Sequence, residues 1–210
     1  MDRLIAGIRT FKTREIEAHP DFWQELASGQ APHTLFITCC DSRVVPSLLT
    51  NTRPGELFVV RNIANIVPFW RESDEFFATT STIEYSVKVL KVRDIVVCGH
   101  SDCGGCAAFY KDEATLATIP HTRKWMELAR PVVEAIRHDE ALMKDPARRA
   151  HETELRNVAL QVEHLLTYPY IREAMAAGEL EVSGWHWDLA SGTVLVLDRE
   201  TGRFKPVTRG

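Results

Sequence analysis

Residues Thr34 to Pro46, TLFITCCDSRVVP, combine a short apolar run with a cluster of reactive side chains. The run from Leu35 to Thr38 predicts a buried strand, because strands of a parallel sheet are covered on both faces and read as continuous apolar segments. Two thiols, a carboxylate and a guanidinium follow at once, and ligand sites gather just beyond the carboxyl ends of such strands. A loop with a surface ion pair and two inert core cysteines would read in the same way. This stretch alone therefore leaves both interpretations open.

A second stretch repeats this design. Residues 94–106, DIVVCGHSDCGGC, give an apolar strand, then polar groups, then glycines that open a helix. His100 and Cys103 have H-x-x-C spacing, which lets one turn of backbone direct both side chains at a single ion, and Cys39 would supply a third ligand. Three Cys/His ligands with an open fourth position are typical of a catalytic zinc site, whereas structural sites usually close with four. The groups can meet only if the two strands share a sheet, which the helical stretch between them favours.

The two motifs together resemble those of the β-class carbonic anhydrases, C-x-D-S-R and H-x-x-C-G-G. Residues 61–65, RNIAN, are similar to the family's R-N-x-A-N segment. Residues 184–188, GWHWD, are similar to its late G-W-x-Y-D strand, with Trp187 where tyrosine is usual. The resemblance extends from about Gln30 to about Leu197, which is nearly the whole chain.

The composition is that of one globular domain. At 210 residues and 23.8 kDa the chain is long enough for a substantial core. The net charge of −4 gives no sign of a basic surface that would bind nucleic acid. No apolar run approaches the roughly 18 residues that span a membrane. The apolar region at the N-terminus is too short for a secretory signal. The chain has five cysteines, and three of them lie beside the expected zinc site, which fits a reducing compartment. We expect a cytoplasmic protein that binds neither nucleic acid nor membrane.

The remaining pattern predicts a single α/β domain over residues 1–210. Residues 1–28 are expected to form a helical arm, because apolar side chains recur at helical spacing between Leu4 and Ala27, and residues 34–200 a zinc-binding core. The central sheet should be mostly parallel, flanked by helices, with late strands that can be antiparallel. Further strands are expected at residues 57–60, 180–187 and 193–197, and helices at residues 75–92, 122–141, 147–166 and 167–177.

The resemblance implies a lyase that reversibly hydrates carbon dioxide to bicarbonate and a proton, with one Zn²⁺ per chain. Cys39, His100 and Cys103 would be the metal ligands, and zinc-bound hydroxide would attack the substrate carbon. Asp41 would accept a hydrogen bond from that hydroxide, while Arg43 keeps Asp41 ionised and turned away from the metal. Because two thiolates donate charge to the ion, we expect its bound water to have a pKa above the value of about 7 found with three histidines. Activity should then rise above neutral pH.

The resemblance also implies a substrate pocket and a partner subunit. Gln30, Phe58 and Tyr85 match pocket residues of the plant-like subgroup, and the amide of Gly104, at a helix N-terminus, is a candidate contact for developing negative charge. In the family the pocket lies at a dimer interface and the N-terminal helices embrace the partner. We therefore expect a homodimer or a higher even homo-oligomer. A nonpolar pocket suits CO2, which carries no charge.

Some family members have an inactive form in which the carboxylate corresponding to Asp41 leaves its arginine and ligates zinc. A bicarbonate held by a tryptophan and an arginine favours that closed form. Arg61 matches the arginine, but Phe36 stands in place of the tryptophan and lacks its indole N–H donor. We predict that the Asp41 carboxylate stays hydrogen-bonded to Arg43 and that the fourth zinc position holds water or an exogenous ligand. Asp41 would be a metal ligand only in a closed form.

Two other activities remain open. An enzyme of the same fold can act on CS2 or COS, because access to the pocket decides between these substrates. Cys103 and Cys106 also form a C-x-x-C pair, which is typical of thiol-disulfide oxidoreductases. In that interpretation His100 and the group Cys39-x-Asp41-x-Arg43 have no role. In the zinc interpretation Cys106 is a surplus thiol.

Several other polar residues receive structural interpretations. Cys40 follows Cys39, so its side chain points away from the metal if strand geometry persists. Cys98 alternates within a strand and is interpreted as a small core residue. His186, between two tryptophans, is expected on the opposite face of its strand from them. The sequence names no proton shuttle and no oligomeric state beyond a dimer unit.

Overall fold

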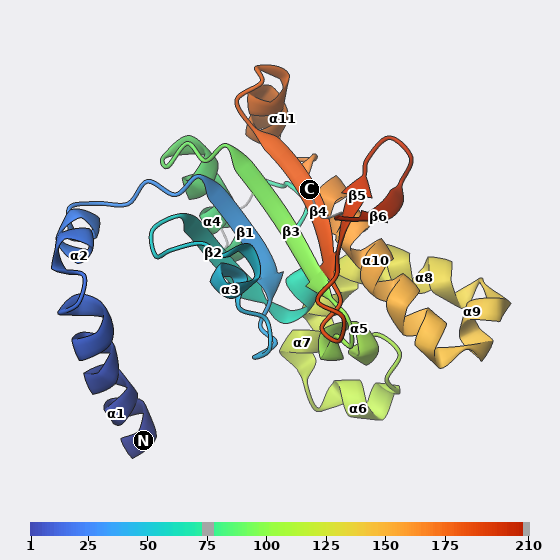
Figure 1. The fold of residues 1–210 in the computed structure, drawn as a ribbon. Helices are drawn as coiled ribbons and strands as arrows, with labels where there is room; N and C mark the ends of the chain where they lie inside the picture. Colours follow the sequence, from blue (N-terminus) through green and yellow to red (C-terminus); the bar gives the residue numbers. More distant parts are fainter. Residues whose placement is uncertain (73–77, 208–210) are drawn as a thin grey trace.

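The computed structural model describes residues 1–72 and 78–207, and a six-stranded sheet lies at its centre (Figure 1). The strands are β1 (Thr34–Cys39), β2 (Leu57–Asn62), β3 (Asp94–His100), β4 (Glu181–Trp187), β5 (Val194–Asp198) and β6 (Arg203–Pro206), in the spatial order β2-β1-β3-β4-β5-β6. Strands β2, β1, β3 and β4 are parallel to one another. Strand β5 is antiparallel to β4, and β6 is antiparallel to β5. The predicted α/β class with a mostly parallel sheet is confirmed. Strand β6 continues the sheet to Pro206, beyond the expected core of residues 34–200.

The two inner strands that carry the motifs are almost completely buried. All six residues of β1 are buried, as are the last six of β3. Their odd and even side chains enter different clusters: Leu35 and Ile95 join the main core, whereas Phe36 and Val96 pack with Trp185 on the other face. Burial on both faces explains why these strands read as continuous apolar runs rather than as alternating ones.

Prolines set where many of the helices begin. The helices of the core are α3 (Pro46–Thr50), α4 (Ala78–Lys88), α5 (Gly104–Ala108), α6 (Glu113–Ala117), α7 (Pro120–Met126), α8 (Arg130–Arg137), α9 (Glu140–Lys144), α10 (Pro146–Leu165) and α11 (Pro169–Ala176). Proline suits the first helical turn, where its missing N–H would have no partner anyway. The helical stretch expected at residues 122–141 is divided into separate helices. Pro131 lies in the first turn of a new helix, α8, and Asp139 caps a third, α9. Residues 75–77, the expected start of the crossover helix, lie outside the described residues, and α4 begins at Ala78.

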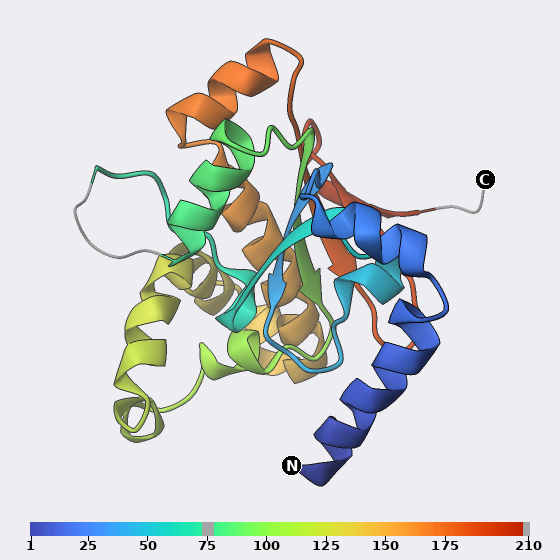
Figure 2. The ribbon, with the colours of Figure 1, turned by 90° about the vertical axis from the view of Figure 1, so that its left-hand side faces the viewer.

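Helix α10 crosses β3 and β4 at very short range (Figure 2). Two glycines on these strands permit the approach. A Cβ on Gly99 would lie 2.6 Å from Cγ2 of Val158, and one on Gly184 would lie 3.0 Å from Cγ1 of the same valine. The side of the sheet that faces α10 therefore has no room for a larger residue at either position.

The N-terminal arm consists of α1 (Asp2–Phe11), a short π-helix (Lys12–Ile16) and α2 (Pro20–Ala27). It projects from the body of the molecule in both ribbon views (Figures 1 and 2). Helix α1 buries none of its residues, and Leu4 and Ile8 are each 67% exposed. Among the described residues, no helix combines the length and apolar character needed to cross a lipid bilayer.

Candidate metal centre

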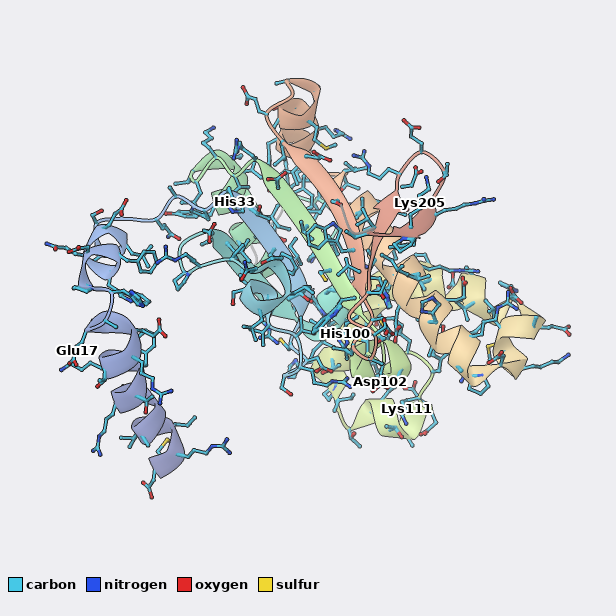
Figure 3. All side chains as sticks on the ribbon, in the orientation of Figure 1. Glu17, His33, His100, Asp102, Lys111 and Lys205 are labelled. Atoms are coloured by element: carbon cyan, nitrogen blue, oxygen red, sulfur yellow. The ribbon has the colours of Figure 1, made fainter. Side chains whose placement is uncertain are left out.

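The two sequence motifs meet where β1 and β3 end. Cys39 is the last residue of β1 and His100 the last of β3, and the two strands are parallel neighbours. Cys103 follows as the N-cap of α5. In Figure 3, His100 and Asp102 lie at this end of the sheet, close to α5. Because parallel strands end at the same edge of a sheet, the fold brings together groups that are 61 to 64 residues apart.

Cys39, His100 and Cys103 form a buried group, here called the ligand cluster, whose donor atoms all lie within 4.8 Å of one another. Each of the three residues is less than 5% exposed. The Sγ atoms of Cys39 and Cys103 are 3.9 Å apart. Two sulfurs at about 2.3 Å from one tetrahedral zinc would be about 3.8 Å apart. The separation of the two thiols therefore already fits a shared zinc ion.

The imidazole of His100 is oriented as a metal ligand would be. Its Nδ1 lies 2.9 Å from the carbonyl oxygen of Ser101, whereas its Nε2 is buried and has no hydrogen-bond partner in the described part of the chain. A backbone carbonyl that accepts from Nδ1–H fixes the tautomer in which the Nε2 lone pair is available to a metal.

The two thiols of the cluster need a nearby positive charge to ionise. The neighbouring Cys103 thiol, followed by burial, raises the pKa of Cys39 to about 12. The pKa of Cys103 is also raised to about 12, first by the adjacent Cys106 thiol. A bound divalent cation reverses this situation, because a coordinating thiol is deprotonated outright. The chemistry of the donor set therefore fits a zinc ion held by two thiolates and one imidazole.

Asp41 and Arg43 form a tightly bonded pair beside the cluster. Oδ1 of Asp41 accepts from the backbone N–H and the Nε of Arg43, both at 2.9 Å, and Oδ2 accepts from Nη2 at 2.8 Å. The Arg43 guanidinium holds the pKa of Asp41 well below its ordinary value. Oδ2 of Asp41 also lies 3.9 Å from Nε2 of His100. An ionised carboxylate with a fixed orientation therefore borders the ligand cluster.

Two further residues hold this loop in place. Arg61 donates from Nε to the carbonyl oxygen of Cys39 at 3.0 Å and from Nη2 to that of Asp41 at 2.6 Å. Asp102, in the left-handed region at φ 55°, accepts from Arg43 Nη1 at 3.0 Å through its side chain and from Nη2 at 3.0 Å through its carbonyl. The guanidinium of Arg43 thus links the loop after β1 to the loop after β3.

Glu154 is a site residue that was not predicted from the sequence. This residue of α10 is 4% exposed, and its Oε1 accepts the backbone N–H of Cys103 at 3.1 Å. A signal for it was available: Glu154, Val158, Val162 and Leu165 recur at helical spacing on the buried side of α10, and only Glu154 among these four is charged. A carboxylate on an apolar helix face is buried only when it has partners.

The predicted substrate-binding residues are only partly gathered within one chain. The rings of Phe58 and Tyr85 have centroids 6.0 Å apart, and Tyr85 remains 45% exposed. Gln30 lines a cavity of about 640 Å³ whose lining includes Phe22 but neither of those two aromatic residues. Gly104 is the first residue of α5, directly after Cys103. Their roles toward a substrate stay predictions.

The residues with structural interpretations lie as expected. Cys40 is exposed, outside the ligand cluster. Cys98 is buried beside Phe36, and burial raises its pKa to about 12. His186 is buried and contacts Glu154 of α10, whereas Trp185 and Trp187 pack on the other face of the sheet. Cys106 is buried next to the cluster but is not one of its three donors.

Comparisons with known proteins agree with this geometry. The family model described as carbonic anhydrase matches residues 34–194. The chain is 40% identical over 207 residues to a carbonic anhydrase of Pseudomonas aeruginosa, covering 97% of this chain and 90% of that protein. It is 36% identical over 203 residues to one of Helicobacter pylori, covering 96% and 92%.

Solved structures give the same result for the fold. The β-carbonic anhydrase CcaA superimposes with a TM-score of 0.93 at 30% identity, covering 100% of this chain and 92% of that one. One of two tetrameric β-carbonic anhydrases from Sordaria macrospora superimposes with a TM-score of 0.77 at 33% identity, covering 100% and 97%. The matched region contains both motifs and all three residues of the ligand cluster. The chain therefore belongs to the carbonic anhydrase family, in its β class.

Proposed function

We propose that this protein reversibly hydrates carbon dioxide to bicarbonate and a proton, with one Zn²⁺ per chain. One observation carries the proposal: two buried thiols and an imidazole nitrogen, which has no hydrogen-bond partner among the described residues, converge beside a carboxylate that Arg43 holds. That combination offers three protein ligands and leaves a fourth position for a small molecule. The P. aeruginosa and H. pylori relatives are both named carbonic anhydrases.

Cys39, His100 and Cys103 would hold the metal. When bound, zinc acts as a Lewis acid that lowers the pKa of a water molecule and so supplies the nucleophile for CO2. Cys106 stays outside the ligand set, because the three donors already satisfy the pattern of a catalytic site and Cys106 is not within the cluster.

Asp41 would orient the nucleophile. Its carboxylate stays ionised at neutral pH because Arg43 lowers its pKa, so it can only accept hydrogen bonds. It lies at the edge of the ligand cluster, where it can accept the hydrogen of the attacking oxygen and leave a lone pair directed at the substrate carbon. The three hydrogen bonds from Arg43 engage both carboxylate oxygens, which would keep Asp41 from becoming a metal ligand itself.

We further propose that Phe58 and Tyr85 form the nonpolar wall of the substrate pocket, as in the plant-like subgroup. Their rings are neighbours, and an apolar wall suits a substrate without charge. Gln30, on the connector from the arm, would complete a pocket across a subunit boundary. The Gly104 amide, at the start of α5, would contact developing negative charge.

The arm supports a homodimer or a higher even oligomer. The apolar side chains of α1 are not covered by the part of the chain that the structure describes: Leu4, Ile5, Ile8 and Phe11 are all at least 44% exposed. A group of exposed apolar side chains of this kind marks an interaction surface. We propose that residues 1–28 pack on a partner subunit, while residues 34 to the end of β6 form the zinc-binding core. The Sordaria macrospora neighbours are described as tetrameric. A cytoplasmic location fits five free cysteines.

The proposal is tested by measuring CO2 hydration and CS2 hydrolysis on the same purified, zinc-loaded protein. We expect rapid, zinc-dependent CO2 hydration and little or no CS2 hydrolysis. Hydrolysis of CS2 without CO2 hydration would assign the site to the other substrate class. If the purified protein takes up no zinc and reduces disulfides, that result would instead support the Cys103–Cys106 oxidoreductase interpretation.

A further inference from the structure

A second group of metal-binding side chains lies behind the ligand cluster, between α10 and β4. It consists of His151 and Glu154, three residues apart on α10, and His186 on β4. Their donor atoms all lie within 4.8 Å of one another. Residues at i and i+3 on a helix point to the same side, so both α10 residues meet the buried face of β4.

The hydrogen bonds of His186 are incomplete. The residue is 0% exposed, and its Nε2 lies 3.0 Å from Oε2 of Glu154. Its Nδ1 is enclosed and has no partner in the parts of the chain that the structure describes. Leaving a buried polar atom unpaired costs about 1–3 kcal/mol, so such atoms are rare in folded proteins.

His151 supplies the opening to solvent. Its side chain is exposed, and its ring stands edge-on to that of His186 with centroids 5.3 Å apart. An exposed imidazole can rotate toward an ion that arrives from solvent, whereas Glu154 and His186 are fixed by packing and by their mutual hydrogen bond. The group therefore combines two fixed donors with one adjustable donor.

We propose that His151, Glu154 and His186 bind a second transition-metal ion, such as Zn²⁺. Two imidazoles and one carboxylate are a donor set that zinc takes in proteins. Two such donors at about 2.0–2.2 Å from a tetrahedral ion lie about 3.3–3.6 Å apart. The 3.0 Å between His186 Nε2 and Glu154 Oε2 is now spanned by a hydrogen bond. An ion that replaces the bridging proton would therefore have to widen this distance by about 0.3–0.6 Å.

Glu154 belongs to the proposed second site and also holds the backbone of Cys103 in the ligand cluster. Glu154 accepts from His186 through Oε2 and from the Cys103 N–H through Oε1. The second ion would therefore lie one carboxylate away from the backbone of a residue of the ligand cluster. This proposal concerns binding alone and does not depend on the substrate of the enzyme.

The test is equilibrium dialysis of the zinc-loaded protein against increasing Zn²⁺, with the metal content of each sample measured directly. The parent should take up a second zinc per chain. His151→Ala changes an exposed residue, so the fold is preserved, and it should weaken uptake of the second zinc at least about tenfold while the first is retained. His138→Ala, which removes an exposed histidine outside this group, is the matched control and should bind as the parent does.

Anomalous scattering from zinc-soaked crystals gives an independent readout. A second peak should lie between His151 and His186, and it should be absent from crystals of His151→Ala. The proposal is overturned if the parent binds only one zinc per chain, or if His151→Ala binds the second as tightly as the parent. It is also overturned if His138→Ala removes the second zinc, because the ion would then bind an unrelated surface site.

Discussion

Replacing Gly105 by alanine should destabilise the zinc-loaded protein, whereas replacing Gly104 should not. The two glycines are adjacent at the start of α5, but their surroundings differ. A Cβ on Gly105 would lie 2.9 Å from the Cβ and 3.1 Å from the backbone N of Ala64, and 3.1 Å from Cγ2 of Ile63. A Cβ on Gly104 would meet no atom of the described residues within 4 Å. The Cβ and the backbone N of Ala64 cannot move away by side-chain rotation, because the backbone of Ala64, at φ 60°, fixes the positions of both atoms.

The magnitude follows from comparing the two variants. Each gains up to about 1 kcal/mol from replacing a helical glycine by alanine, so this gain cancels in the difference. What remains is the overpacking at Gly105, which costs about 1–3 kcal/mol in a closely packed region. In a chain of this size 1 kcal/mol changes the melting temperature by about 2–4 °C. Gly105→Ala should therefore unfold about 2–12 °C below Gly104→Ala.

The assay is thermal unfolding of both variants by circular dichroism, with zinc release to a chelator measured in parallel. Because Cys103 directly precedes α5, a displaced α5 should also release zinc faster in Gly105→Ala. Equal melting temperatures and equal release rates in the two variants would refute the close packing of α5 against residues 63–65.

Three further predictions concern the metal and its carboxylate. Alanine at any position of the ligand cluster should remove both zinc and activity, whereas Cys106→Ala should keep one zinc per chain, as measured by metal analysis. An equal loss of zinc in Cys106→Ala would overturn the ligand assignment. A mild oxidant should release zinc reversibly by joining Cys103 to Cys106, and this idea fails if Cys106→Ser loses zinc under oxidant as readily as the parent. Arg43→Ala should lower the rate of CO2 hydration about 10- to 100-fold, because Asp41 loses the partner that orients it. Asp102→Asn should have a much smaller effect, since it leaves the bonds between Asp41 and Arg43 intact, and equal losses in the two variants would contradict this role for Arg43.

Much of the candidate site could be predicted because its information is local. Cys39 and His100 each stand at the end of an apolar run, and Cys103 follows His100 by three residues. The helical stretch between the two runs favours parallel strands in one sheet. Asp41 and Arg43 are two residues apart, so their pairing depends on one short loop. Burial of both faces of β1 and β3 produced the continuous apolar pattern that identified them.

The parts that could not be predicted depend on distant contacts or weak local signals. Glu154 reaches the Cys103 amide from 51 residues away, and no spacing rule connects a helix interior to a loop at that range. The role of Asp102 depends on a left-handed backbone at a non-glycine residue. Strand β6 is a four-residue edge strand with only one of its residues partly buried, so it carries no apolar pattern.

The most direct test of the account is a crystal structure of the zinc-loaded protein at about pH 7.5. We predict that zinc is bonded to Cys39, His100 and Cys103 and to one water or exogenous ligand, with Asp41 hydrogen-bonded to Arg43. Phe36 supports this open form, because it is buried edge-to-face against Trp185, 5.9 Å between centroids, and offers no donor to a bound bicarbonate. An Asp41 oxygen found about 2.0–2.2 Å from zinc, within the range of a ligand bond, would contradict it.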